Sequence, residues 1–302
     1  MSNGSKLLLV GLRGSGKTSY LAALWHEVEA GEIPTALTSS ELQPDREHLN
    51  QIREKWLSFQ EVGRTSLRSQ ETVSLLLRDV SGAKVDVVVP DLSGELYRLQ
   101  WVNRKVTRSY ADFAAQSCGA LLLIHPGAVV KSERILALGS SEIPSSGGSL
   151  PPPNAFDSES STPPNAKATK EWTPEVASTQ VQLIELLQFI SFLRPMSGPF
   201  RIAVIVSAWD LISEPILPIS WLETHLPLLY QYVVANAAAV PFRVYGVSAL
   251  GGDLAKDLGR LQNEVVPSRR IKVVEDRPKP HGDLTAPIQF LLDLNSAHAN
   301  SV

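Results

Sequence analysis

Residues 11–18 read GLRGSGKT, and this stretch decides the fold because it matches the P-loop pattern G-x-x-x-x-G-K-[ST]. Its glycines let the backbone wrap around a chain of phosphates, with successive N–H groups turned toward anionic oxygens. Lys17 brings a positive charge to the β- and γ-phosphates, and the Thr18 hydroxyl is placed to bind Mg²⁺. The pattern therefore predicts a binding site for a nucleoside triphosphate.

The residues on either side have the character that a P-loop requires. The apolar run at residues 7–10 ends at Gly11 and is typical of a buried parallel strand. Residues 19–25 combine good helix formers with apolar side chains at helical spacing. A helix that begins here turns its free N–H groups and the positive end of its dipole toward bound phosphates. The context argues against a chance glycine-rich loop.

The composition is that of an ordinary globular protein. The chain has 302 residues, of which 43% are hydrophobic and 20% are charged, enough for one large domain or two small ones. A net charge of −3 indicates no basic surface for nucleic acid. No apolar run is long enough to cross a membrane and no signal peptide is recognisable, so we expect a cytoplasmic protein. Cys118, the single cysteine, is expected to be a buried structural thiol.

Apolar strands alternate with helical stretches along the rest of the chain. We expect strands at residues 72–77, 84–89, 120–125, 200–206 and 242–247, and helices at residues 45–59, 102–115, 176–193, 221–238 and 285–295. The first two of these strands are joined by so short a turn that they must be antiparallel. Residues 251–280 lack a clear pattern, although 271–274 is a candidate edge strand. The alternation predicts a three-layer α/β domain with a mostly parallel sheet and one antiparallel edge strand.

Residues 139–173 differ in composition from the rest of the chain. They are rich in Ser and Pro and lack the apolar surface needed to pack. Because strands and helices alternate again beyond them, we expect one domain over residues 1–302 that carries a disordered insertion. Docking of a partner protein is the alternative role for this proline-rich segment.

Polar residues follow the expected strands, and right-handed crossovers place these strand ends on one rim of the sheet. Asp91 follows the strand at 84–89, where it either contacts Mg²⁺ through water or caps the helix that follows. Gly94 can bring its N–H against a γ-phosphate because it has no Cβ. His125 ends another strand, as a catalytic base or, more commonly at such positions, as a polar plug at the rim.

Four segments in this order resemble the Ras-like P-loop GTPases. They are residues 11–18; residues 91–94, which match Asp-x-x-Gly; residues 207–210, Ser-Ala-Trp-Asp, in the place of Asn-Lys-x-Asp; and residues 248–250, Ser-Ala-Leu, which match Ser-Ala-[KL]. The resemblance covers about residues 5–250 and the terminal helix. The group that it most resembles is that of the bacterial double-GTPase proteins of conflict-system operons. It implies the fold of a Ras-like G domain.

The resemblance implies GTP or GDP and Mg²⁺ as ligands. Asp210 would accept both the N1–H and the exocyclic amine of guanine, a donor pair that adenine lacks, and the Ala249 N–H would meet the guanine O6. The other residues implied to contact the nucleotide are Gly11, Arg13, Gly14, Ser15, Gly16, Lys17, Thr18, Ser19, Gly94, Ser207, Trp209, Ser248 and Leu250. The Mg²⁺ ligands would be Thr18, Asp91 and a switch threonine, for which Thr65 fits best, with Ser66 and Thr72 as alternatives.

The chain departs from the family pattern at several of these positions. Ser207 and Ala208 replace an Asn and a Lys, and Trp209 is a candidate for the wall over the base that the Lys would supply. Glu95 stands where many members carry a Gln that orients the attacking water, and Arg13 stands where efficient hydrolases have a small residue. With Lys17, Glu95 and Thr65 as the catalytic candidates, we expect slow intrinsic hydrolysis.

The leading interpretation is a guanine-nucleotide-dependent molecular switch, a GTPase with slow Mg²⁺-dependent hydrolysis. It would regulate or recruit a partner protein through residues 31–70 and 91–100 or through the proline-rich insertion. The alternative is a nucleotide-bound interaction module that does not hydrolyse GTP. We expect neither nucleic acid nor a membrane as partner, and the sequence leaves open a homodimer across the nucleotide face.

Overall fold

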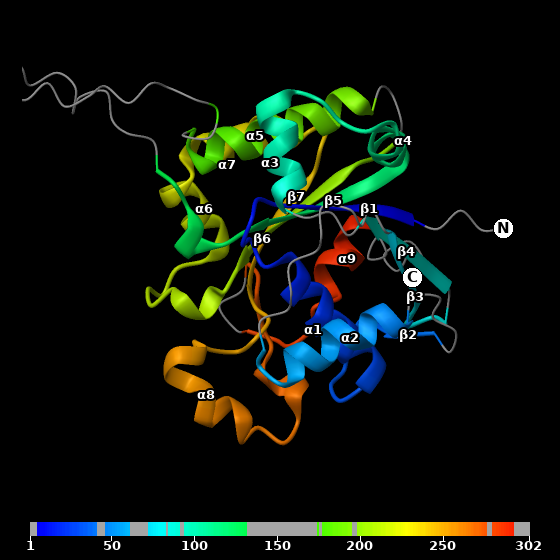
Figure 1. Ribbon diagram of the computed structural model, residues 1–302, viewed down its shortest axis with the longest axis vertical. Coiled ribbons are helices and arrows are strands. Elements are labelled where there is room, and N and C mark those ends of the chain that lie inside the picture. The colour runs from blue at the N-terminus through cyan, green and yellow to red at the C-terminus, as the bar shows by residue number, and fades with distance from the viewer. Residues whose placement is uncertain are drawn as a thin grey trace, which may run out of the picture.

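Eight strands of the described chain form one sheet in the order β2-β3-β4-β1-β5-β6-β7-β8 (Figure 1). The computed structural model describes residues 5–40, 46–60, 72–82, 84–90, 94–131, 174, 177–194, 198–276 and 280–292. The strands are β1 (Ser5–Val10), β2 (Leu37–Ser39), β3 (Thr72–Asp79), β4 (Lys84–Pro90), β5 (Ser117–Ile124), β6 (Arg201–Ser207), β7 (Phe242–Ser248) and β8 (Lys272–Val274). The α-helices are α1 (Lys17–Ala30), α2 (Arg46–Leu57), α3 (Gly94–Asn103), α4 (Arg108–Gln116), α5 (Thr179–Leu193), α6 (Pro218–His225), α7 (Pro227–Ala235), α8 (Leu254–Gln262) and α9 (Ala286–Leu291). Short 3₁₀ turns are η1 (Pro126–Ala128), η4 (Trp209–Leu211) and η5 (Pro267–Arg270).

The sheet is mostly parallel, which confirms the predicted α/β class. Strands β4, β1, β5, β6 and β7 are parallel neighbours, and β3 and β4 form the predicted antiparallel hairpin. The prediction of one antiparallel edge strand needs a correction, because β2 pairs outside β3 and a second antiparallel strand, β8, pairs with β7. Strand β2 has only three residues, too few for a recognisable alternation.

The helices cover both faces of the sheet in three layers. Successive strand side chains point to opposite faces, so Leu7 and Leu9 pack with α1, α2 and α9, whereas Leu8 and Val10 pack with α3 to α7. Figure 1 shows the same division, with α1, α2 and α9 on one side of the sheet. Because the central strands are buried on both faces, they are continuously apolar in the sequence.

Two predicted helices are each divided in the structure. The helix expected at residues 102–115 is interrupted after Asn103 by Arg104, whose φ is 54°. Helix α4 begins after Thr107, whose side-chain oxygen accepts the N–H of Tyr110 at 3.2 Å. The helix expected at 221–238 is divided into α6 and α7 at Leu226, because the following Pro227 disfavours a helical conformation there.

Helix α8 lies in the stretch that has no clear pattern in the sequence. It is capped by Asp253, whose carboxylate accepts the N–H of Ala255 at 2.9 Å. Its inner residue Leu261 is buried, whereas Leu258 is 39% exposed. The helix thus buries only a narrow apolar side, and its three leucines at helical spacing, Leu254, Leu258 and Leu261, are hard to notice among the polar residues around them in the sequence.

The predicted insertion at residues 139–173 lies outside the described residues. The described segments on either side of it meet just after η1 and at the start of α5, where the Val130 N–H donates to the Thr179 hydroxyl at 2.9 Å. The Thr179 N–H donates in return to the Val130 carbonyl at 3.0 Å. The chain therefore leaves and re-enters the described fold at one point.

Cys118 is half-buried in β5, and its thiol lies 3.6 Å from the carbonyl oxygen of Lys6. Burial raises the pKa of this thiol, which lowers its reactivity and fits the expected structural role. Among the helices that the structure describes, none has both the length and the apolar character needed to cross a membrane.

A buried carboxyl group joins α1 to the segment before α9. The Glu27 side chain is fully buried, and its Oε2 accepts the N–H of Leu284 at 2.8 Å. The Tyr20 hydroxyl donates to the carbonyl of the same residue, also at 2.8 Å. Burial raises the pKa of Glu27 from 4.5 to about 9, because a buried carboxylate loses its hydration.

We predict that Glu27→Gln stabilises the protein in alkaline solution and has little effect in mild acid. The folded state keeps a proton on Glu27 that the unfolded chain releases, so this group's stabilisation is present below pH 4.5 and is lost as the pH rises through about 9. Glutamine keeps the oxygen that accepts the Leu284 N–H and does not titrate. The expected increase in the free energy of unfolding at about pH 9 is on the order of 1–3 kcal/mol. Denaturant unfolding of both proteins across this pH range measures the difference. An equal change in the free energy of unfolding in mild acid and at about pH 9 would contradict the raised pKa of Glu27.

Candidate functional site

The predicted P-loop joins β1 to α1 with a left-handed backbone at two glycines. Gly14 and Gly16 have φ angles of 73° and 90°, which residues with a side chain rarely adopt. A Cβ at Gly16 would in addition lie 3.1 Å from the Ser207 hydroxyl oxygen. The loop is therefore a backbone cradle at the N-terminus of a long helix, the geometry that binds phosphate groups.

The Lys17 ammonium lies against this loop and is almost completely buried. It donates to the carbonyl oxygens of Gly11 at 2.8 Å and Leu12 at 3.2 Å, and it lies 3.4 Å from the Ser15 hydroxyl. The ring of Tyr97 from α3 is on its other side, 5.8 Å from the nitrogen. The charge is thus held in the cradle, where an anionic ligand would meet it.

Ser207, at the end of β6, joins the P-loop to the rest of the rim. Its hydroxyl lies 2.9 Å from the Ser15 carbonyl oxygen and 3.3 Å from that of Ile124. The side chain is 8% exposed, so this bond is shielded from water. Ser207 therefore braces the cradle against β5 and β6.

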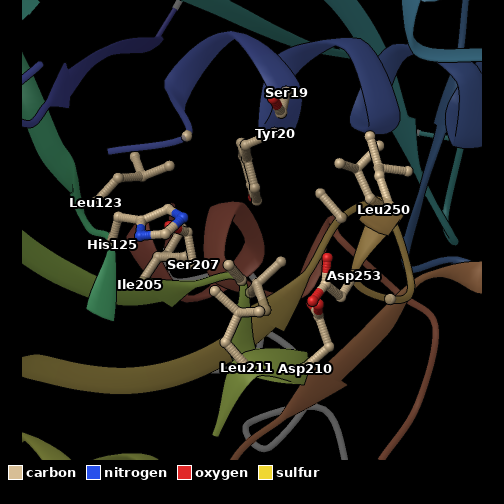
Figure 2. Close-up of a pocket in the computed structure, with 16 residues that line it drawn as sticks. Ser19, Tyr20, Leu123, His125, Ile205, Ser207, Asp210, Leu211, Leu250 and Asp253 are labelled. Carbon is tan, nitrogen blue, oxygen red and sulfur yellow. The ribbon is translucent and has the colours of Figure 1, made fainter. Parts of the chain in front are cut away.

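A cavity of about 310 Å³ opens between the start of α1 and the ends of β5, β6 and β7 (Figure 2). Its walls include apolar side chains from these three strands, namely Leu123, Ile205 and Val247. The predicted site residues among those that line it are Gly16, Ser19, Ser207, Asp210, Ala249 and Leu250. The cradle and the distant carboxylate thus face one cavity, which the sequence interpretation requires.

Asp210 is held in place by Ser248, although it is exposed at the edge of the cavity. The Ser248 hydroxyl donates to Oδ1 of Asp210 and accepts the N–H of Gly251 at 3.0 Å. Ser248 is only 1% exposed, so its hydroxyl is fixed by both partners. The carboxylate is therefore oriented before any ligand binds.

The predicted role of Trp209 as a wall over a base is not supported by its position. Its ring packs against Gly246 of β7, where a Cβ would come within 2.3 Å of the ring. It belongs to the apolar layer on the α5 side of the sheet and is not among the residues that line the cavity. Leu211 and Leu250 line the cavity instead, together with Ala208, whose φ is 46°.

His125 lines the cavity and also caps η1, so it is more than the polar plug expected from the sequence. Its Nδ1 accepts the N–H of Gly127 at 3.1 Å, which leaves the proton of the neutral ring on Nε2. Burial lowers the pKa of His125, and the nearby Asp210 opposes this shift more weakly. Figure 2 shows the ring beside Ser207.

The remaining predicted site residues are placed only in part. Thr18 is half-buried in the first turn of α1, and Arg13 is exposed on the P-loop. Gly94 and Glu95 open α3, whereas Asp91 and Thr65 lie outside the described residues. Thr18 is therefore the one described residue among the three leading Mg²⁺ ligands, and Thr72, an alternative switch threonine, is described at the start of β3. The described part of the chain holds no cluster of three His, Cys, Asp or Glu side chains that could bind a metal.

Several lining residues do not stand out in the sequence. Leu123, Ile205 and Val247 are the last apolar residues of their strands on the α1 side, and in the sequence they look like ordinary core residues. Tyr20 and Asp253 lie outside the four motifs. The signal that could find them is position, because each of the three apolar residues lies one or two positions before the carboxyl end of a parallel strand.

The residues at the two ends of this cavity determine which kind of ligand it can bind. Apolar walls suit a flat ring, a fixed carboxylate at the edge suits ring N–H donors, and the cradle at the other end suits phosphate groups. One ligand that has a ring and a phosphate chain fits this arrangement.

The sequence matches a known protein family. The family model for Double-GTPase 1 matches residues 8–291. No curated protein matches the chain. Among solved structures, the GTP-bound GTPase-like domain of S. cerevisiae Ski7 is 15% identical, with a TM-score of 0.41 over 99% of this chain and 51% of that one. This chain therefore spans about half the length of that protein.

A second similar structure is the signal recognition particle receptor SRb-GTP/SRX complex from Chaetomium thermophilum. It is 12% identical, with a TM-score of 0.38, and the match covers 84% of this chain and 94% of that one. The family match extends over nearly the whole sequence and includes the P-loop, Asp210 and the Ser248 loop, and the chain therefore belongs to the Double-GTPase 1 family.

Proposed function

We propose that this protein is a molecular switch that binds GTP or GDP and hydrolyses GTP slowly with Mg²⁺. The observation that carries the proposal is that Gly16 of the cradle and Asp210 line one cavity. Ser207 ties the two regions together through its bond to Ser15. A single nucleotide can thus contact both ends.

At the phosphate end, the P-loop N–H groups and Lys17 would bind the β- and γ-phosphates. The Lys17 ammonium would exchange the Gly11 and Leu12 carbonyl oxygens for phosphate oxygens, which carry more charge. Thr18 would bind Mg²⁺, with Asp91 contacting the ion through water and Thr65 completing the ligands. The ion would supply positive charge at the bridge between the β- and γ-phosphates.

At the base end, the oriented Asp210 carboxylate would accept the N1–H and the 2-amino group of guanine. Adenine has an acceptor at N1 and no 2-amino group, so it would leave the carboxylate without donors. Such charge-assisted hydrogen bonds correspond to a preference of about 10- to 100-fold. Leu211 and Leu250 also line the cavity and would contact the faces of the guanine ring, which Trp209 does not reach.

Slow turnover follows from the two residues that depart from the family pattern. Glu95 opens α3 in the place of a water-orienting Gln, and its negative charge would stand near the γ-phosphate. Arg13 is exposed on the P-loop, where its bulk would hinder an arginine supplied by a partner. The alternative that these residues favour is an interaction module that keeps its nucleotide unhydrolysed.

Partner proteins would bind the segments whose order depends on the γ-phosphate, residues 31–70 and 91–100, or the proline-rich insertion. The cytoplasm is the proposed location. A homodimer across the nucleotide face is a further arrangement, which sedimentation with and without GTP distinguishes from a monomer.

We predict that Asp210→Asn changes the base preference from GTP to XTP. Xanthine has a carbonyl where guanine has its 2-amino group, so the Asn amide can donate where the Asp carboxylate accepted. We expect the wild-type protein to prefer GTP over both ATP and XTP, and the variant to lose about 10- to 100-fold in GTP affinity and to gain XTP affinity. Titration calorimetry with the three nucleotides and Mg²⁺ measures this.

Lys17→Ala is the control for that experiment. It removes the phosphate contact and leaves the base end intact, so it should weaken GTP, ATP and XTP alike. Tighter binding of ATP than of GTP by the wild-type protein would exclude the proposed guanine specificity.

We also predict a slow but measurable release of phosphate from GTP in a single turnover. The expected rate constant without a partner is on the order of 10⁻⁴ to 10⁻² s⁻¹, and it should require Mg²⁺. Glu95→Gln should raise it, because an amide can orient water without repelling the γ-phosphate. Stoichiometric binding of GTP with no phosphate release over hours would instead support the non-hydrolysing module.

A further inference from the structure

Helix α2 lies within the predicted switch segment, yet it is fastened to α1 and to the loop after β7. It packs along α1, the helix that carries Lys17, and the Trp25 indole N–H of α1 donates to the Asn50 side chain of α2 at 3.0 Å. At its other end, the Trp56 indole N–H donates to the carbonyl oxygen of Ala249 at 3.1 Å. Ala249 belongs to the loop that lines the cavity after β7.

The Trp56 ring is held in one orientation by its neighbours. It is fully buried, with the His26 ring 5.0 Å away on a tilted plane. The Arg270 guanidinium lies 4.5 Å from its centre, a distance typical of a cation–π contact. The direction of the Trp56 N–H is therefore set by the packing of the ring against these two residues.

The loop that accepts this hydrogen bond is supported at its other residues as well. Ser248 is bonded to Asp210 and to the Gly251 N–H. Gly251 has a φ of 87°, and a Cβ on it would lie 2.3 Å from the carbonyl oxygen of Arg270, the residue that also covers Trp56. Trp56 and Arg270 thus fix the loop together from the side of α2 and η5.

The Trp56 indole N–H is bonded to the carbonyl of the peptide group that joins Ala249 to Leu250. In a trans peptide the C=O and the N–H point in opposite directions. Because the Ala249 carbonyl points toward Trp56, the N–H of Leu250 in the same plane points away from it. Ala249 and Leu250 both line the cavity whereas Trp56 does not, so an N–H that points away from Trp56 can face the cavity.

We propose that Trp56 is a positioning residue for base recognition, which holds the Ala249–Leu250 peptide so that the Leu250 N–H faces the 6-position of a purine, beside the Ala249 N–H that the resemblance to the Ras-like GTPases places there. The proposal rests on the function proposed above. A donor at this point favours the 6-oxo group of guanine over a 6-amino group. If the peptide rotated, it would present its carbonyl, an acceptor, and the preference would weaken or reverse.

The test compares GTP with 2-aminoadenosine triphosphate, which keeps the 2-amino group that Asp210 would bind and differs only at N1 and the 6-position. Trp56→Phe keeps an apolar ring and removes the N–H. We expect the ratio of the two affinities to fall about 5- to 10-fold, the effect of one buried hydrogen bond. Inorganic tripolyphosphate with Mg²⁺, which has no base, should bind both proteins equally.

Trp101→Phe is the matched control. Trp101 of α3 is also buried and also donates its indole N–H to a carbonyl, that of Pro174 at 2.6 Å, but it lies among the helices on the opposite face of the sheet. Its loss should leave the affinity ratio unchanged. Thermal unfolding of both variants shows whether they are equally folded.

An equal loss of affinity for both nucleotides in Trp56→Phe would indicate a merely structural role and would overturn the proposal, as would an unchanged ratio. Failure of the wild-type protein to bind GTP would instead refute the proposed function. If Trp56→Phe does not fold, the wild-type protein still tests the proposal, because its Trp56 indole N–H resonance should shift with GTP and not with tripolyphosphate. No shift with GTP would overturn it.

Discussion

The hydrogen bond between Ser207 and the Ser15 carbonyl is the constraint on which the candidate site depends. It joins two loops that are almost two hundred residues apart in the chain, at the point where β6 ends beside the P-loop. A neutral hydrogen bond contributes only about 1 kcal/mol, but loss of the donor would leave a buried carbonyl unsatisfied at a cost of about 1–3 kcal/mol. Gly16 lies so close to this hydroxyl that the two positions constrain each other.

In the same region, the residues that depart from the Ras-like pattern make contacts of their own. A serine is shorter than the asparagine it replaces, yet its hydroxyl still reaches the cradle. The neighbouring Ala208 adopts a left-handed conformation, and Trp209 turns into the apolar layer where Gly246 leaves room for its ring. The surface left to a ligand is therefore made by Leu211 and Leu250.

Helix α2 gives part of the segment between the P-loop and β3 a different role from the one that the sequence predicts. As a stretch of sequence it resembles a switch region, but in the fold it belongs to the core, with Trp56 buried in contact with His26 and Arg270. Its hydrogen bonds reach α1 on one side and the loop after β7 on the other. Changes in the base site and in the position of α2 are therefore physically linked.

The sequence by itself determined the α/β class, the P-loop and the order of the motifs, because hydrophobic periodicity and glycine spacing are local properties. It also located the strand ends at which Ser207, Asp210 and Ser248 lie. Only the tertiary structure decided that Ser207 braces the cradle, that Trp209 faces away from the cavity and that Trp56 reaches Ala249. These contacts join residues far apart in the chain, and a side chain's direction depends on the space that its neighbours leave, which no local pattern records.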